Sequence, residues 1–300
     1  MVYTEIKEKK GRRYYYRVVS VRKGKKVEKR RVYLGANLEK HALFERELEA
    51  DKKLLFLNSM LDKEDLGFLD EIKSRYLKEP KQSLENRYEA FCSLFTYDSA
   101  AIEGNTFTLR QTSSLLFDKI VPSSKSLREV NEILNHKKAF DYILNYRGDI
   151  TKKFILELHG LIVNDTLRPE LANQIGKYRT VQVYIRGADW TPPKPGDVPK
   201  EMKTLLLWYS RNKKSLHPLV TAAYFHARFE IIHPFVDGNG RVGRLLMNFI
   251  LHKNKYPMIN IPNRIRHKYY NALHEAQVNG NLIPFVRLLT SILKESSILF

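Results

Sequence analysis

Helical spacing governs most of this chain and limits the folds open to it. From Leu38 onward, apolar residues recur three and four positions apart, as they do in helices that bury one face. One strand-like stretch interrupts this pattern, TVQVYIRG at 180–187, and the proline-rich loop after it indicates an exposed hairpin or flap. We therefore predict a mainly α fold, a helical bundle with a short β-hairpin flap. The predicted helices cover residues 39–58, 81–98, 108–119, 127–146, 152–164, 197–211, 218–232, 241–253, 264–278 and 282–294.

Two of these helices carry start signals. Ser126 precedes Glu129 by three positions, which is the spacing of a capping box. Asp197 and Pro199 suit the first positions of another helix, because an acidic cap and an early proline both favour a helix start. These two boundaries are therefore the most sharply predicted in the chain.

The N-terminal residues follow a different pattern. RRYYYRVVSV and VEKRRVYL are rich in β-branched and aromatic residues and flank the turn sequence RKGKK, so residues 12–34 are predicted to form a hairpin. Residues 1–40 contain 14 Lys and Arg against 4 Asp and Glu, a net charge of +10 out of +19 for the whole chain. We predict a small basic N-terminal β-hairpin region over 1–37 and a helical body over 38–300.

The basic hairpin allows two interpretations. Its aromatic and cationic side chains could stack on bases and contact phosphates, which would make residues 1–35 a nucleic-acid-binding surface. Aromatic residues alternating with charged ones also describe a two-faced sheet that packs on a helix. The sequence leaves both open. The side chains concerned are those of Arg12, Arg13, Tyr14, Tyr15, Tyr16, Arg17, Arg30, Arg31 and Tyr33.

Composition bounds the class of protein. With 300 residues, 43 % of them hydrophobic, the chain can bury a substantial core. No stretch approaches 18 consecutive apolar residues and the N-terminus is charged, so we expect neither a signal peptide nor a membrane partner. The single cysteine, Cys92, can form no internal disulfide and is expected to be a buried thiol, in keeping with a cytoplasmic protein.

The segment HPFVDGNGRVGR at 233–244 lies between two helical runs and has the composition of an anion site. A helix N-terminus presents unpaired N–H groups and a partial positive charge, and both attract phosphate. Gly238 and Gly240 allow a phosphate to approach the backbone, because they lack the Cβ that would obstruct it. Arg241 and Arg244 are three positions apart and can add forked cationic donors.

The same segment contains an acid and a base. Asp237 offers a hard oxygen ligand suited to Mg²⁺ that is shared with phosphates. His233, four positions earlier, can accept a proton near neutral pH. A histidine before a proline, or a glycine turn, would each alone be structural more often than functional. Their convergence on one turn favours a phosphate-transfer site.

The glycines of this turn also satisfy G-x-G-x-x-G, through Gly238, Gly240 and Gly243, but we exclude a dinucleotide-binding fold. That motif follows a strand and precedes an acidic residue by about 20 positions. Here the preceding run is helical, and no Asp or Glu occurs between Asp237 and Glu275.

HPFVDGNGRVGR matches the motif of the Fic family, HPFx[D/E]GNGRxxR, at every specified position. The resemblance extends over about 90–294 and includes GKYRTVQVYI, similar to the flap region of the family. It implies a Fic-type helical bundle with its core at about 150–294. It also implies an enzyme that moves AMP from ATP onto a protein hydroxyl and releases pyrophosphate, with Mg²⁺ as cofactor.

The resemblance assigns roles to individual residues. It implies that His233 is the general base and that Asp237 binds Mg²⁺. At the position where relatives often have Asn near the nucleotide, this chain has Gln277. Nucleotide contacts are implied for Gly238, Asn239, Gly240, Arg241, Val242, Gly243, Arg244, Tyr269 and Tyr270, although the two tyrosines could equally be core residues. The flap residues expected to hold a target segment by strand addition are Val183, Tyr184, Ile185 and Arg186.

An upstream segment, 97–106, resembles the inhibitory motif [S/T]xxxE[G/N] of autoinhibited Fic proteins through Ser99, Glu103 and Gly104. Ser99 and Glu103 lie on one face if the segment is helical, and Gly104 suits the end of that helix. The resemblance implies that Glu103 pairs with Arg244 and competes with the γ-phosphate of ATP.

The expected function is a protein adenylyltransferase that modifies a Ser, Thr or Tyr hydroxyl of a target protein or of itself. Removal of AMP by the same site is also open, as are transfer of another phosphate-containing group and a nucleic-acid-binding regulator with a nucleotide-sensing body. The expected partners are ATP and a protein target, with a homodimer as a family-level expectation.

Overall fold

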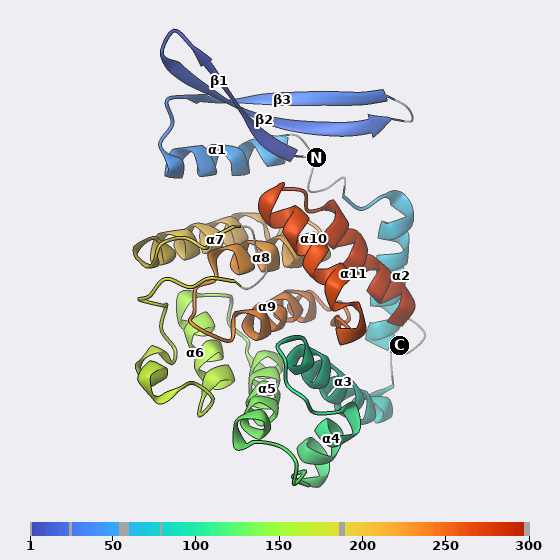
Figure 1. Cartoon of the computed structure of the whole chain (residues 1–300). Helices are drawn as coiled ribbons and strands as arrows, with labels where there is room; N and C mark the ends of the chain where they lie inside the picture. The colour runs from blue at the N-terminus through green and yellow to red at the C-terminus, as the bar shows by residue number, and fades with distance from the viewer. Residues whose placement is uncertain (1, 24–25, 54–59, 79, 186–189, 297–300) are drawn as a thin grey trace.

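The computed structural model describes residues 2–23, 26–53, 60–78, 80–185 and 190–296. A small antiparallel sheet with one helix lies at one end of the molecule, and a larger helical body makes up the rest (Figure 1). The mainly α fold class predicted from the sequence is therefore confirmed.

The sheet contains three antiparallel strands in the order β1-β2-β3, namely β1 (Val2–Lys9), β2 (Arg12–Lys23) and β3 (Lys26–Ala36). The predicted hairpin corresponds to β2 and β3. The sequence reading missed β1, although VYTEIKEK alternates apolar and charged residues as an edge strand does. A register shift between Tyr15 and Tyr16 marks a bulge against β3, which increases the local twist.

Helix α1 (Lys40–Lys53) covers one face of this sheet. Tyr15, Leu34 and Ala50 form a small core of their own, separate from the core of the body. By packing, α1 therefore belongs with the sheet, so the boundary predicted at 37 falls inside this unit.

The body consists of helices joined by short loops. Its elements are α2 (Lys63–Lys78), α3 (Lys81–Ile102), α4 (Leu109–Ser113) with a π-helical turn at Ser114–Asp118, α5 (Leu127–Asn145), α6 (Lys152–Val163), α7 (Val198–Asn212), α8 (Pro218–Ile232), α9 (Asn239–Lys253), α10 (Arg266–Val278) and α11 (Ile283–Ser296), with 3-10 turns at Pro169–Gln174, Pro195–Asp197 and Asn263–Ile265. Helix α9 is buried along most of its length and contacts α3, α5, α6 and α8 (Figure 1). The segment predicted to carry the chemistry therefore opens the central helix of the body.

Helix α2 is the element of the body that the sequence reading missed. Its run, KEDLGFLDEIKSRYLK, buries only Leu69 and Ile72, so its apolar face is narrow, and Gly67 weakens the helical pattern further. Helix α3 is also longer than predicted, because it continues past residue 98 to Ile102. This extension makes the start of the proposed inhibitory segment helical.

The two start signals behave differently. Ser126 and Glu129 form the predicted capping box at the start of α5, in which each side chain bonds the backbone of the other residue. Asp197 does stand at the N-cap of α7 with Pro199 just after it, but its side chain makes no capping bond. The helix starts where predicted, with the proline rather than the acid as the observed signal.

The predicted flap is not a strand in its described part. Residues 180–185 are irregular, and Arg186, which was expected to contact a target, lies outside the described residues. Side chains take the place of a partner strand here. Arg179 donates to the carbonyl of Val181 at 3.1 Å, and Gln182 donates to the carbonyls of Val183 and Pro192, each at 3.1 Å. TVQVYI has a high β-propensity, but it does not form a strand because no neighbouring strand pairs with it among the described residues.

Cys92 is fully buried in α3, as predicted, and burial raises the pKa of its thiol to about 11. None of the described helices combines the length and the apolar character that crossing a bilayer requires.

Candidate active site

The motif loop joins α8 to α9 as the sequence predicted. Helix α8 ends at Ile232, and His233 follows as its C-cap in the left-handed region, with φ 47°. Such a backbone is uncommon outside glycine and strained. Gly238, with φ 80°, is the N-cap of α9, and a Cβ there would lie 2.9 Å from the Val163 side chain. Position 238 therefore requires glycine for both its conformation and its close packing on α6.

Buried side chains hold the loop in shape from inside. Asn239 accepts a bond from the Phe235 N–H and donates one to the Phe235 carbonyl, both at 2.9 Å. His159 stacks on the Phe235 ring at 3.7 Å with an interplanar angle of 3°. Its Nδ1 accepts from Gly176 N–H at 3.1 Å, so Nε2 carries the proton and donates to the Asp237 carbonyl at 3.2 Å. Burial lowers the pKa of His159 to about 4, so this ring is a neutral brace at pH 7.

Arg179 fixes the same loop from outside, and the sequence reading missed it. Its side chain is 2 % exposed, and its Nε donates to the His233 carbonyl at 2.8 Å. Its backbone N–H donates to the Pro234 carbonyl at 2.9 Å. In the sequence Arg179 is one of two cations within GKYRTVQVYI, and no local pattern predicts its contact with His233, 54 residues further along the chain.

The two motif arginines face different partners. Arg241 is buried and donates from Nη2 to Asp237 Oδ1 at 3.2 Å, while Nη1 lies 3.9 Å from Glu132 of α5. Its Nε and Nη1 have no hydrogen-bond partner among the described residues. Because a buried guanidinium rarely leaves two N–H groups unpaired, these donors are suited to bind an anion.

Arg244 is held by α3. Its Nε donates to Ser99 Oγ at 3.0 Å, and its Nη2 donates to the Ser99 carbonyl and to Glu103 Oε1, both at 2.8 Å. The pairing of Glu103 with Arg244 expected from the sequence is therefore present. Gly104 follows with φ 101°, a conformation that suits glycine at a helix end.

Glycine at position 240 is what allows Glu103 to approach this closely. A Cβ at Gly240 would lie 2.1 Å from Glu103 Oε1, well inside contact distance. Two further contacts hold the end of α3 near the motif. Tyr270 donates from its hydroxyl to the Ile102 carbonyl at 3.2 Å, and Asp98 accepts bonds from the Asn260 side chain and the Asn263 N–H.

A cavity of about 440 Å³ opens beside the motif, a size typical of small-molecule sites. It joins α3, α8, α9 and α10 to the residues around the flap. Its walls include Glu103, Ile185, Trp190, Glu230, His233, Gly240, Arg244, Tyr269, Tyr270 and Gln277.

The two tyrosines of α10 differ. Tyr269 is buried and bonds His226 through its hydroxyl at 2.7 Å, whereas Tyr270 is 44 % exposed. Both line the cavity, Tyr269 as a core residue and Tyr270 as an exposed one.

The structure does not bring all the predicted residues to this cavity. Asp237 and Arg241 lie on the α5 side of the motif, where Asp237 Oδ2 is 3.6 Å from Arg128. Val242 is fully buried in the core, so only its backbone could face a ligand. Of the flap residues, Ile185 lines the cavity, but Val183 is absent from its walls and Tyr184 is 80 % exposed.

The His233 ring is uncharged at neutral pH. Burial lowers the pKa of its imidazole to about 4, so the ring is neutral at pH 7. Its Nδ1 lies 3.4 Å from the Glu230 carbonyl oxygen. With a proton on Nδ1 the ring donates to that carbonyl, and Nε2 keeps a lone pair that can accept a proton.

Glu230 is the second site residue that the sequence reading missed. It lies on α8 one turn before His233, with Oε2 3.8 Å from His233 Nδ1. Burial, together with the charge of Glu103 and against the opposing effect of Arg244, raises the pKa of its carboxyl to about 8. Its Oε1 has no hydrogen-bond partner among the described residues, and a Cβ at Gly243 would lie 2.4 Å from that atom. At pH 7 the carboxyl is therefore mostly protonated, so it places little negative charge beside the His233 ring.

Comparison with known proteins agrees with this geometry. A model of the Fic/DOC family matches residues 149–251, which contain α6 to α8, the motif loop and most of α9. The crystal structure of a Fic domain-containing signalling protein from Bacteroides thetaiotaomicron is 30 % identical, with a TM-score of 0.72, over 78 % of this chain and 95 % of that one. This chain belongs to the Fic/DOC family.

Other Fic proteins extend the likeness. Fic-1 from C. elegans (residues 134–508) superposes with a TM-score of 0.70 at 27 % identity, over 87 % of this chain and 77 % of that one. "Protein adenylyltransferase Fic" from Drosophila persimilis is 43 % identical over 197 residues, which are 64 % of this chain and 37 % of the relative. Its namesake from Drosophila virilis is 40 % identical over 235 residues, 74 % of this chain and 47 % of the relative. The chain therefore spans less than half the length of these curated relatives.

Proposed function

We propose that this Fic protein transfers AMP from ATP to a hydroxyl side chain of a protein. The observation that carries the proposal is the neutral imidazole of His233 on the wall of a cavity that also contains Gly240 and Arg244. The curated relatives named protein adenylyltransferase, at 40–43 % identity, support it.

In the proposed reaction the target hydroxyl gives its proton to His233 Nε2 as its oxygen attacks the α-phosphorus of ATP. A new P–O bond forms to the target, the bond between the α-phosphorus and the β-phosphate oxygen breaks, and pyrophosphate leaves. The backbone N–H groups at the start of α9 and the guanidinium groups of Arg241 and Arg244 would stabilise the negative charge. His233 needs only to accept one proton, because positioning and charge neutralisation supply most of the rate.

Asp237 is the residue proposed to hold Mg²⁺. Among the described residues no cluster of three or more His, Cys, Asp or Glu side chains could bind a metal ion. A single carboxylate beside an anion site fits Mg²⁺ nevertheless, since this ion usually takes one or two protein carboxylates and completes its shell with phosphates and water. When bound, Mg²⁺ would neutralise phosphate charge. Asp237 is 37 % exposed and could turn toward it from Arg241.

The pair of Glu103 and Arg244 supports an autoinhibited resting state. Arg244 has its Nη2 on Glu103 and its Nε on Ser99, so the donors that an outer phosphate would use are already engaged. ATP could then bind only with its outer phosphates displaced, which misaligns the α-phosphorus for attack. Because Glu103 lies at the cavity wall, the same carboxylate could also activate water for removal of AMP.

The target is proposed to dock beside the cavity at the flap. Ile185 lines the cavity, and Tyr184 is a large exposed apolar side chain next to it. An extended target segment paired with the described part of the flap would bring its hydroxyl toward His233.

Intact-protein mass spectrometry after incubation with ATP and Mg²⁺ tests the function. The variant Glu103→Gly should gain the mass of one AMP or more, and the double variant Glu103→Gly/His233→Ala should gain none. A gain of the mass of phosphate instead would show that the protein transfers phosphate and not AMP. No gain in Glu103→Gly, on itself or on proteins of a cell extract, would refute an active transferase.

A further inference from the structure

The N-terminal sheet has one face that its own helix uses. Tyr15 and Leu34 pack with Ala50 of α1, and Arg17 lies 3.7 Å from Glu47 on the same helix. On this inner face, aromatic and charged residues pack the sheet on a helix, which is the structural one of the two interpretations of the N-terminal sequence.

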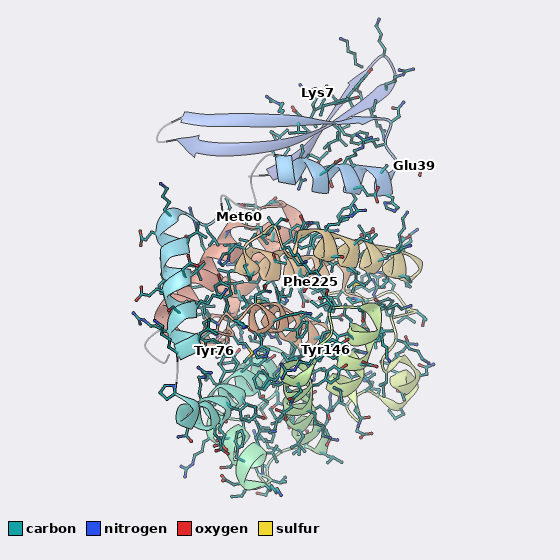
Figure 2. The ribbon with its side chains drawn as sticks, turned by 180° about the vertical axis from the view of Figure 1, so that it is seen from behind. Lys7, Glu39, Met60, Tyr76, Tyr146 and Phe225 are labelled. Atoms are coloured by element: carbon teal, nitrogen blue, oxygen red, sulfur yellow. The ribbon has the colours of Figure 1, made fainter. Side chains whose placement is uncertain are left out.

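The opposite face is built differently, although the same strands supply it. Register places Lys7 of β1 opposite Tyr14, and Tyr16 opposite Tyr33 of β3. Ring contacts confirm that these side chains share one face, since the Tyr33 ring lies 6.5 Å from Tyr14 and 5.3 Å from Tyr16. We call this the tyrosine face; its members are Lys7, Lys9, Arg12, Tyr14, Tyr16 and Tyr33. It lies on the far side of the sheet from α1, and Figure 2 labels Lys7 in this sheet at the end of the molecule away from the body.

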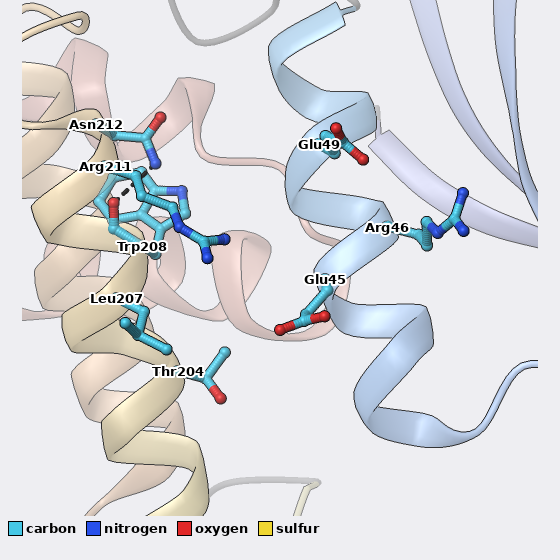
Figure 3. A pocket seen from close by; sticks show the side chains of 8 residues that line it. All are labelled: Glu45, Arg46, Glu49, Thr204, Leu207, Trp208, Arg211 and Asn212. Carbon is cyan, nitrogen blue, oxygen red and sulfur yellow. Dashed lines mark hydrogen bonds between the residues drawn. The ribbon is translucent and has the colours of Figure 1, made fainter.

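Positive charge collects on the tyrosine face because acids are kept elsewhere. The one acid that the register adds to this face is Glu5, which is paired with Arg31 at 3.0 Å. The acids of α1 lie on the side of the sheet away from this face. Glu45 and Glu49 line a pocket of about 270 Å³ together with Arg211 of α7, and Figure 3 shows Glu45 extending from α1 toward that helix.

Cations stand on both edges of the sheet, with aromatic residues between them. Lys7 and Lys9 are exposed on edge strand β1, and Lys29 is exposed on edge strand β3, next to Arg31, which is paired with Glu5. Three strands at about 4.8 Å spacing place these edges about 10 Å apart, close to the roughly 12 Å width of the DNA major groove. A sheet seated there would set each row of cations beside one phosphate backbone.

We propose that the tyrosine face binds double-stranded DNA in the major groove. The cations on the two edges contact phosphates on either side of the groove. The tyrosine hydroxyls between them point toward base edges. This binding surface is independent of the transferase site and would bring the Fic body to DNA or to proteins assembled on it.

The packing of the tyrosines favours duplex over single-stranded nucleic acid. Single-strand binders stack bases on open aromatic faces. Here the Tyr16 ring is covered by Lys7 Nζ, 5.6 Å from its centroid, and by the tilted ring of Tyr33. With the Tyr16 ring occupied in this way, its hydroxyl and the surrounding charge are what it offers to a ligand.

Fluorescence anisotropy with the full chain tests the proposal, using a labelled 20-base-pair duplex of mixed sequence at several salt concentrations. The wild type should bind, with log K falling linearly as log[salt] rises. The triple variant Lys7→Ala/Lys9→Ala/Arg12→Ala should bind at least about 10-fold more weakly, and its salt slope should be shallower by about 2 to 3. A matched control with the same change in charge is Lys152→Ala/Lys153→Ala/Lys177→Ala, at exposed positions on the body, which should bind as the wild type does.

The variant Tyr16→Phe/Tyr33→Phe keeps the rings that pack the face and removes only their hydroxyls. It should fold as the wild type does, shown by circular dichroism, and bind the duplex several-fold more weakly. Equal loss in the body control, unchanged binding in the triple variant, or tighter binding of a single strand of the same length would each overturn the proposal.

Discussion

Replacement of Glu230 by Gln tests whether the carboxyl next to the proposed base is neutral. Gln has nearly the same shape as protonated Glu and cannot ionise. In the folded protein the Glu230 pKa is about 8, against an ordinary value of 4.5. As pH rises above 4.5, the unfolded chain releases this proton and the folded chain keeps it. Stability should therefore fall as pH rises, by up to about 1.4 kcal/mol for each pH unit, until the folded carboxyl ionises near pH 8.

The size of the effect follows from those two pKa values. At pH 5 the Glu230 carboxyl destabilises the wild type by less than about 1 kcal/mol, and at pH 7 by about 3 kcal/mol. The Gln variant lacks this contribution. Its stability advantage over the wild type should therefore grow by about 2 to 3 kcal/mol between pH 5 and pH 7.

Urea unfolding followed by circular dichroism, at half-unit steps from pH 5 to pH 8, measures this difference. Taking variant minus wild type removes other titrating groups, because they contribute to both. Glu89→Gln, the same substitution on the exposed surface of α3, is the matched control and should not reproduce the gain of about 2 to 3 kcal/mol. If Glu230→Gln also gives a constant difference, the carboxyl is already ionised at pH 7, which would refute the neutral state assigned to Glu230.

Three further predictions concern neighbouring contacts. In the Glu103→Gly background, Arg179→Lys should reduce AMP transfer about 10-fold to 100-fold, because charged hydrogen bonds of about 1.5–3 kcal/mol to the motif loop are lost. ATP affinity should change less, and an equal fall in ATP affinity would contradict a positioning role. Tyr270→Phe removes the hydrogen bond to the Ile102 carbonyl, worth about 1 kcal/mol, and so loosens the end of α3 that carries Glu103. Basal AMP transfer by this single variant should rise several-fold, and an unchanged rate would show that this bond does not hold α3. Burial lowers the pKa of His136 to about 3, so the folded protein loses free energy of unfolding as pH falls below about 6.5 and the unfolded chain takes up this proton. In urea unfolding from pH 6.5 to 4, His136→Gln should therefore lose less stability than the wild type, and an unaltered profile would contradict burial as the cause.

The sequence predicted the elements of the body well where a wide apolar face or a capping signal marks them. Helices α5 to α9 have such faces, and the Ser126 box set the start of α5. Helix α2 was missed because it buries two residues on a narrow face, and β1 because charged residues fill half of its positions. The flap was predicted as a strand from β-propensity, but no partner strand meets its described part, and side chains of Arg179 and Gln182 take its carbonyls instead.

Local pattern could place the functional residues on one turn, but it could not show what each of them contacts. Arg241 and Arg244, three apart on α9, project from neighbouring positions, and the sequence treats them alike. The fold separates them, since Arg241 contacts Asp237 and approaches α5, whereas Arg244 contacts Ser99 on α3, 145 residues away.

Glu230 is a second residue whose surroundings the local sequence pattern could not predict. Nothing in AAYFHARFEIIHPF marks Glu230 as buried, and only the packing of α8 against α9 and α10 encloses it. Enclosure is what moves its pKa and so decides the charge beside His233. The charge next to His233 therefore depends on the tertiary burial of Glu230, a residue outside the motif, and the local sequence pattern could not show that burial.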